Sequence, residues 1–144
     1  MNFKYLFATL VAVTCSMSSF ADTLGVIVSH SGDDLVGKRL AVEVKNSVRN
    51  STLFHLIYTP DDKVYGISLV TIDPDEDTRD ADLRTTYSAT FILNSGELFD
   101  YHMTSIVGVC GADKVKSCSE KLIQDLSVQH EDLLEAMVQA GAFD

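Results

Sequence analysis

The stretch Leu24-Gly-Val-Ile-Val-Ser-His30, with Ser31-Gly32-Asp33-Asp34 and the amphipathic segment after it, decides the fold. Its first seven residues are mostly apolar or β-branched and end at a Ser-Gly pair, which is typical of a strand. Asp33 and Asp34 follow where acidic side chains favour the start of a helix. Apolar residues then recur at helical spacing and predict a helix of about four turns; they are Gly37, Leu40, Val44 and Val48.

Downstream, the pattern predicts four more strands and a final helix. The segment 64–72 is almost continuously apolar and is expected to lie centrally in a sheet. A turn is expected at 94–97, and the final helix is expected to open at Asp113 and to break near Val128. The predicted order of elements is β-α-β-β-β-β-α. Because two helices cannot cover both faces of a five-stranded sheet, this order predicts a two-layer α/β (α+β) sandwich with a mixed sheet. The other expected strands are 53–58, 84–93 and 98–109.

The chain begins with the pattern of a secretory signal peptide. Lys4 precedes an apolar run, and small residues stand just before Asp22. This predicts a signal peptide at 1–21, one domain at 22–144, and a periplasmic or secreted location. The apolar run is shorter than the roughly 20 residues that span a bilayer. Because Thr14 precedes Cys15, no lipid anchor is expected, and Cys15 should leave with the signal peptide.

Charge and cysteine content limit the partners. Loss of Lys4 changes the formal net charge of −10 for the whole chain to −11, which disfavours nucleic acid and anionic lipid surfaces. The expected partner is another envelope or secreted protein, or a second copy. Once Cys15 has left, two cysteines remain, Cys110 and Cys118. An even number of cysteines in an oxidising compartment predicts a disulfide between them. A metal or redox role fits less well, because no Cys or His lies between them and the spacing is not Cys-x-x-Cys.

The acidic segment 73–82 invites a calcium interpretation, because Asp73, Asp75 and Asp77 alternate as oxygen ligands do. However, Thr78 and Arg84 stand where an EF-hand loop needs glycine and glutamate. A solvated loop is therefore expected, and calcium binding stays an open alternative.

One histidine is a further candidate for a metal or acid–base site. His30 lies beside Asp33 and Asp34, but no second histidine stands at a metal-ligand spacing. The sequence therefore predicts no catalytic residue, no metal site and no cofactor. Lys38, Lys45 and Arg49 share one helix face, which is either solvated or a second interaction surface.

The two strands at 84–93 and 98–109 alternate between apolar and polar residues, which predicts a hairpin with one buried and one wet face. Val107 is expected on the buried side. The wet side is the predicted interaction surface; its residues are Thr86, Ser88, Thr90, Asp100, His102 and Thr104.

These features predict a non-enzymatic protein-interaction module of the bacterial cell envelope. Two alternatives stay open: a small hydrolase or metal-dependent enzyme built on His30, and an inhibitor of a basic secreted enzyme, which the negative charge and the disulfide would suit.

Three segments resemble a family of small bacterial secreted or periplasmic proteins that carry signal peptides: 33–41, 69–75, and 107–110 together with Cys118. The resemblance covers most of the mature chain but names no chemistry and implies no functional residue. The opening strand–helix–strand is also similar in outline to the N-terminal domain of TolB and to the α/β core of the curli secretion lipoprotein CsgG. This second resemblance concerns the fold alone.

Overall fold

The computed structural model of the chain describes residues 23–59, 64–94 and 100–141. The predicted signal peptide and most of the predicted turn at 94–97 lie outside the described residues. Seven elements follow one another in the predicted order: β1 (Leu24–Ser31), α1 (Leu35–Arg49), β2 (Phe54–Leu56), β3 (Val64–Ile72), β4 (Arg84–Asn94), β5 (Asp100–Gly111) and α2 (Val115–Gln139).

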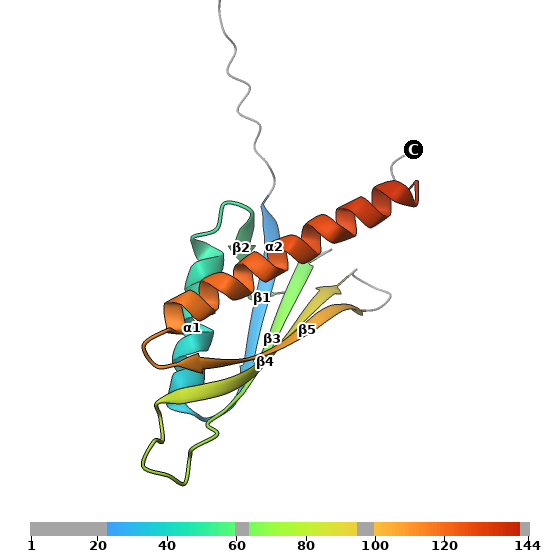
Figure 1. The fold of residues 1–144 in the computed structure, drawn as a ribbon. Helices are drawn as coiled ribbons and strands as arrows, with labels where there is room; N and C mark the ends of the chain where they lie inside the picture. The colour runs from blue at the N-terminus through green and yellow to red at the C-terminus, as the bar shows by residue number, and fades with distance from the viewer. Residues whose placement is uncertain (1–22, 60–63, 95–99, 142–144) are drawn as a thin grey trace, which may run out of the picture.

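The five strands form one mixed sheet in the order β2-β1-β3-β4-β5. β1 pairs in parallel with both β2 and β3, whereas the pairs β3–β4 and β4–β5 are antiparallel. β3 lies at the centre, as its apolar sequence predicts. Both helices lie on one face of the sheet and leave the other face open (Figure 1). The predicted two-layer sandwich is confirmed.

The start of α1 is fixed by a side-chain cap and a close approach to the sheet. Oδ1 of Asp34 accepts a hydrogen bond from the backbone N–H of Gly37, as an N-cap aspartate does. A Cβ at Gly37 would collide with the Thr71 side chain on β3, so only glycine lets the helix lie this close. The predicted apolar stripe of α1 is buried, including Leu40, Val44 and Val48.

The core lies between the helix layer and the covered face of the sheet. Alternate strand residues point into it, so the apolar side chains of each strand remove one face of the sheet from water. The largest fully buried side chains come from strands and helices alike: Phe54, Ile67, Leu69 and Phe91 from the sheet, and Leu40, Leu122 and Leu126 from the helices.

The helix α2 is continuous over 25 residues, so the predicted break near Val128 was wrong. Its buried residues end at Leu126, and the oxygen of Tyr65 meets Nδ1 of His130 at 2.6 Å one turn later. Past this contact the helix extends beyond the end of the sheet (Figure 1). We call residues 127–139 the overhang.

The predicted disulfide is confirmed. Cys110 at the end of β5 is bonded to Cys118 in the second turn of α2, with their Cα atoms 6.2 Å apart. Cys110 is fully buried. The bond therefore holds the beginning of α2 against the last strand, and it is typical of an oxidising compartment.

Candidate interaction surface

Strand register arranges the open sheet face as parallel rows of side chains. One row runs Val70–Ser88–Val107 and the next runs Ile72–Thr86–Val109, each across β3, β4 and β5. The four aliphatic side chains of these rows are between 52% and 73% exposed. We call Val70, Ile72, Val107 and Val109 the apolar patch. Large β-branched residues are rarely left this exposed as a group, so the patch marks a surface that another molecule could cover.

The row beside the apolar patch consists of hydroxyl side chains. Register aligns Ser29, Ser68, Thr90 and Ser105 across four strands. The hydroxyl oxygens of Thr90 and Ser105 are 3.0 Å apart, and Nε2 of His102 lies 2.9 Å from that of Ser105. Each hydroxyl can both donate and accept a hydrogen bond, so this row can pair with many polar surfaces without a complementary charge.

A shallow hollow lies at the other end of the face. It has a volume of about 180 Å³ and is lined by Ile27, Gly66, Ile92 and Asp100, among others. Gly66 carries no side chain at this point of the central strand, which leaves the hollow between the neighbouring aliphatic residues. The hollow extends the apolar character of the face towards β1.

The structure places five of the six predicted surface residues on the open face and one on the other. Thr86, Ser88 and Thr90 alternate with the buried residues of β4, and His102 and Asp100 oppose Ile92 and Asn94. The prediction for Thr104 was wrong, because this residue opposes the fully buried Phe91.

The cause is an irregularity in β5. The pairing passes from Phe91–Thr104 to Ile92–His102, so Met103 is an extra residue that reverses the alternation. For the same reason Val107, predicted to be buried, is 73% exposed. Sequence alternation missed the apolar patch entirely.

The residues around His30 are held by local contacts. Nε2 of His30 lies 2.9 Å from Oγ1 of Thr71, and partial burial lowers the pKa of His30 below its ordinary value. Asp34 caps α1 through one oxygen, and its buried Oδ2 has no hydrogen-bond partner among the described residues. Within that same part of the chain, no three His, Cys, Asp or Glu side chains are grouped so that they could hold a metal ion.

The acidic loop between β3 and β4 uses its carboxylates to hold itself together. Both oxygens of Asp73 accept backbone N–H groups, from Asp75 and Asp82, at 2.8 Å each. Arg84 donates two hydrogen bonds to Asp75, at 2.6 and 3.1 Å, and thereby lowers the pKa of that carboxyl group. Asp82 has a positive φ of 63°. Two of the three alternating aspartates are thus engaged within the protein.

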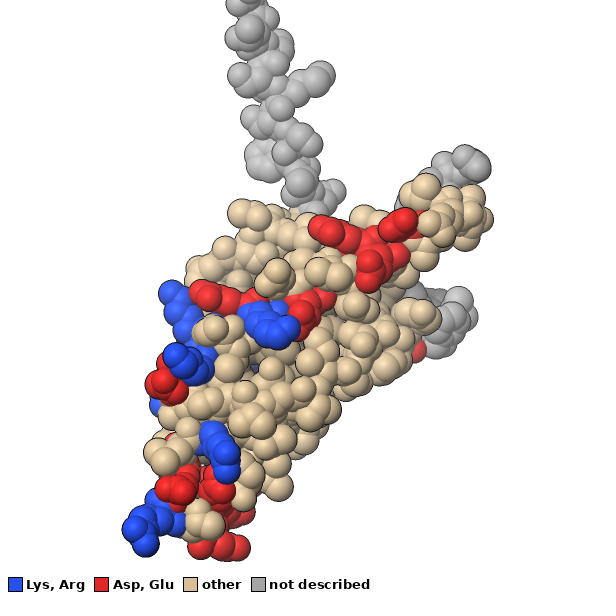
Figure 2. Space-filling view, viewed as in Figure 1, with Lys and Arg blue, Asp and Glu red and all other residues tan. Residues whose placement is uncertain are grey.

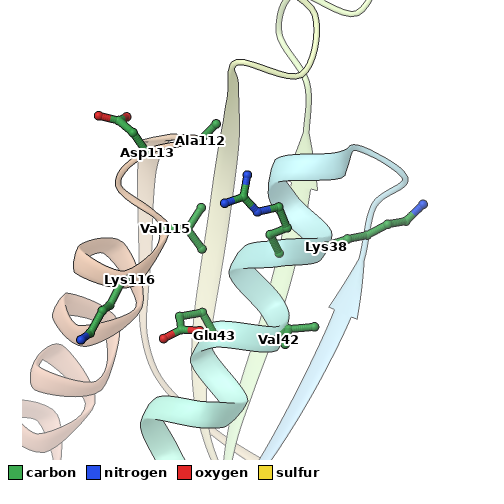
Figure 3. A pocket seen from close by; sticks show the side chains of 8 residues that line it. Lys38, Val42, Glu43, Ala112, Asp113, Val115 and Lys116 are labelled. Carbon is green, nitrogen blue, oxygen red and sulfur yellow. The ribbon is translucent and has the colours of Figure 1, made fainter.

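The two ends of α2 differ in charge. Lys and Arg side chains lie among Asp and Glu over α1 and the first part of α2, whereas the far part of α2 shows acidic side chains (Figure 2). A hollow of about 610 Å³ lies between α1 and the start of α2 and is lined by Lys38, Val42, Glu43, Val115 and Lys116, among others (Figure 3). The predicted basic face of α1 therefore borders a second concave surface.

Comparisons with known proteins identify no family. No protein-family model and no curated protein matches the chain. A solved structure of a single-residue variant of PelC from Paraburkholderia phytofirmans, described as a dodecamer, matches with 15% identity and a TM-score of 0.43. The match covers 71% of this chain and 83% of that chain. The resemblance to TolB and CsgG finds no support here. In the described part of the chain, no helix has the length and apolar content needed to cross a membrane.

Proposed function

We propose that this chain is a non-enzymatic protein-binding module of the bacterial cell envelope and that the open sheet face is its binding surface. The observation that carries the proposal is the apolar patch, two pairs of exposed aliphatic side chains on β3 and β5 that lie on either side of the Thr86 and Ser88 side chains of β4. The centres of protein interfaces are poor in charge and rich in apolar area, and the two rows of the patch have this composition.

The size of the face indicates what kind of complex it forms. Four strands about 4.8 Å apart and four rows about 6.8 Å apart give roughly 500 Å² of flat area. Standard interfaces bury about 800 Å² on each partner, and smaller ones belong to weak or transient complexes. We therefore expect a reversible complex with a flat partner surface that has an apolar centre and some polar groups.

The proposed location rests on two separate features. Positions 1–21 have the pattern of a cleaved signal peptide. Cys110 and Cys118 form a disulfide, which suits the periplasm or the exterior. The formal negative charge of the chain disfavours nucleic acid as a partner. The partner is accordingly an envelope or secreted protein, and a second copy is the alternative that the experiment distinguishes.

The experiment compares two matched double variants. Ser88→Arg/Val107→Arg places two charges at the centre of the open face. Ser117→Arg/Val128→Arg makes the same changes at exposed positions of α2. Each tagged protein is exported, cross-linked in intact cells and captured, and the bound proteins are identified by mass spectrometry. Circular dichroism and the melting temperature check that both variants fold.

The proposal expects a partner that the wild type and the α2 variant capture and the sheet variant does not. Capture that is identical for all three proteins would contradict it. If the captured species is another copy of the same chain and depends on Ser88 and Val107, the face binds itself.

A further inference from the structure

The overhang of α2 is amphipathic, and its side chains from Leu134 to Gln139 are exposed once the helix passes the contact of His130 with Tyr65. Leu133 continues the buried stripe of the first half, and the neighbouring Leu134, Met137 and Val138 are between 37% and 64% exposed. Three acidic side chains also lie on its exposed surface, namely Glu131, Asp132 and Glu135. From Leu122 to Gln139 the helix contains no Lys or Arg, so no basic residue stands in its last turn to offset the dipole.

The outer face of α1 has the opposite charge and its own exposed apolar residues. Leu35 and Val42 are 53% and 59% exposed. Helical spacing places them on the same side of the helix as Lys38, Arg39 and Arg49. The ion pair of Lys38 with Asp33 is 3.6 Å long and lies in solvent, so it holds Lys38 only weakly.

The two surfaces also match in length. A helix rises about 1.5 Å per residue, so the overhang is about 20 Å long and α1 is about 22 Å long. We propose that the overhang of one copy docks along the outer face of α1 of a second copy. Leu134, Met137 and Val138 would lie against Leu35 and Val42, and the acidic side chains would lie beside Lys38 and Arg39.

Charge excludes the two other places where a second copy could receive the overhang. Two overhangs packed on each other would bring Glu131, Asp132 and Glu135 against the same residues of the partner, and like charges repel. The open sheet face is bordered at its apolar end by the acidic loop, which contains Glu76, Asp77 and Asp80 in exposed positions. The outer face of α1 is the described surface that combines basic and exposed aliphatic residues on one element.

The contact is head-to-tail, because the overhang and α1 are different parts of each copy. Each docked pair then keeps one free overhang, on one copy, and one free α1 face, on the other, so association continues into a chain or closes into a ring. The helix layer carries this assembly and leaves the open sheet face accessible. The inference is therefore independent of the proposed function.

The experiment measures self-association by analytical ultracentrifugation of the purified exported protein. At low ionic strength the average mass should rise with protein concentration. In about 0.5 M NaCl, where charges are screened within a few Å, association should weaken at least tenfold. An overhang variant, Leu134→Ser/Met137→Ser, and a face variant, Lys38→Glu/Arg39→Glu, should each remain monomeric. Val128→Ser is the control, since helical spacing places that side chain about 120° from Leu134 and about 180° from Met137 around the helix axis.

Mixing the two variants gives the decisive result. The face variant keeps its overhang and the overhang variant keeps its α1 face, so the mixture should form a 1:1 dimer and nothing larger. A wild type that stays monomeric at all concentrations and salts would overturn the inference. So would an association that both variants retain. If Ser88→Arg/Val107→Arg abolishes association and the helix variants do not, the sheet faces join the copies, and the proposed binding surface survives while this inference fails.

Discussion

Two glycines of the sheet form a matched pair for testing how tightly its covered face is packed. Gly108 of β5 opposes Tyr87 of β4 and faces the core. A Cβ added at Gly108 would lie 2.6 Å from the hydroxyl oxygen of Tyr87 and 2.7 Å from its Cζ, whereas ordinary contacts begin near 3.4 Å. Tyr87 is only 6% exposed, so its ring has little space into which it can move.

We expect Gly108→Ala to lower the free energy of unfolding. Overpacking costs about 1–3 kcal/mol, and the lower entropy of alanine in the unfolded chain returns about 0.5–1 kcal/mol of that. The net loss is about 1–2 kcal/mol, which lowers the melting temperature by about 3–8 °C in a domain of this size. Urea denaturation followed by circular dichroism measures the loss directly.

Gly66→Ala is the control on the open face. Its Cβ would lie 3.5 Å from Cβ of Ile92, an ordinary contact, so the entropic gain should leave the protein as stable as the wild type or slightly more stable. The reasoning is refuted if Gly108→Ala is as stable as the wild type, or if both variants lose the same amount.

Three further predictions concern the disulfide, a histidine and the acidic loop. Cys110→Ala/Cys118→Ala removes a cross-link between residues eight apart in the sequence. By the loop-entropy relation, the free energy of unfolding should fall by about 2.5 kcal/mol. Thermal melting measures this loss, and an unchanged melting temperature would contradict the prediction. Burial lowers the pKa of His130, so the unfolded chain binds its proton more readily and stability should fall as the pH drops below about 6.5. His130→Gln should therefore lose less stability on acidification in urea titrations, and equal slopes for the two proteins would show that His130 makes no difference. Both oxygens of Asp73 accept backbone N–H groups, which an asparagine cannot do. Asp73→Asn should therefore lose about 1–2 kcal/mol in the same titrations, whereas exposed Asp77→Asn should lose almost none; equal losses would refute the role given to Asp73.

Short sequence patterns predicted most of this fold, because helix caps and the spacing of apolar residues depend on neighbouring residues alone. The Asp34 cap and the spacing of Leu40, Val44 and Val48 identify α1 without reference to the rest of the molecule. The apolar run of β3 identifies the centre of the sheet in the same way. The pairing of Cys110 with Cys118 follows from there being two cysteines after the predicted signal peptide.

The candidate surface could not be predicted as well, because it depends on register and on the relative lengths of elements. One extra residue at Met103 turns Thr104 inward and Val107 outward, and nothing in the alternation of β5 indicates that insertion. The apolar stripe of α2 continues to Val138 in the sequence, but the sheet beneath it ends earlier. Whether Met137 is buried or exposed is decided by the extent of that sheet.

Because of the disulfide and the overhang, the two ends of α2 differ in how firmly they are attached to the rest of the protein. Cys118 keeps the first turns of the helix bonded to β5 even while the rest of the helix opens, and His130 contacts Tyr65 near the point where the helix leaves the sheet. Local unfolding of α2 therefore proceeds from Gln139 towards His130. The helix re-forms on turns that never leave the protein, so it avoids the costly first step of helix nucleation each time it closes.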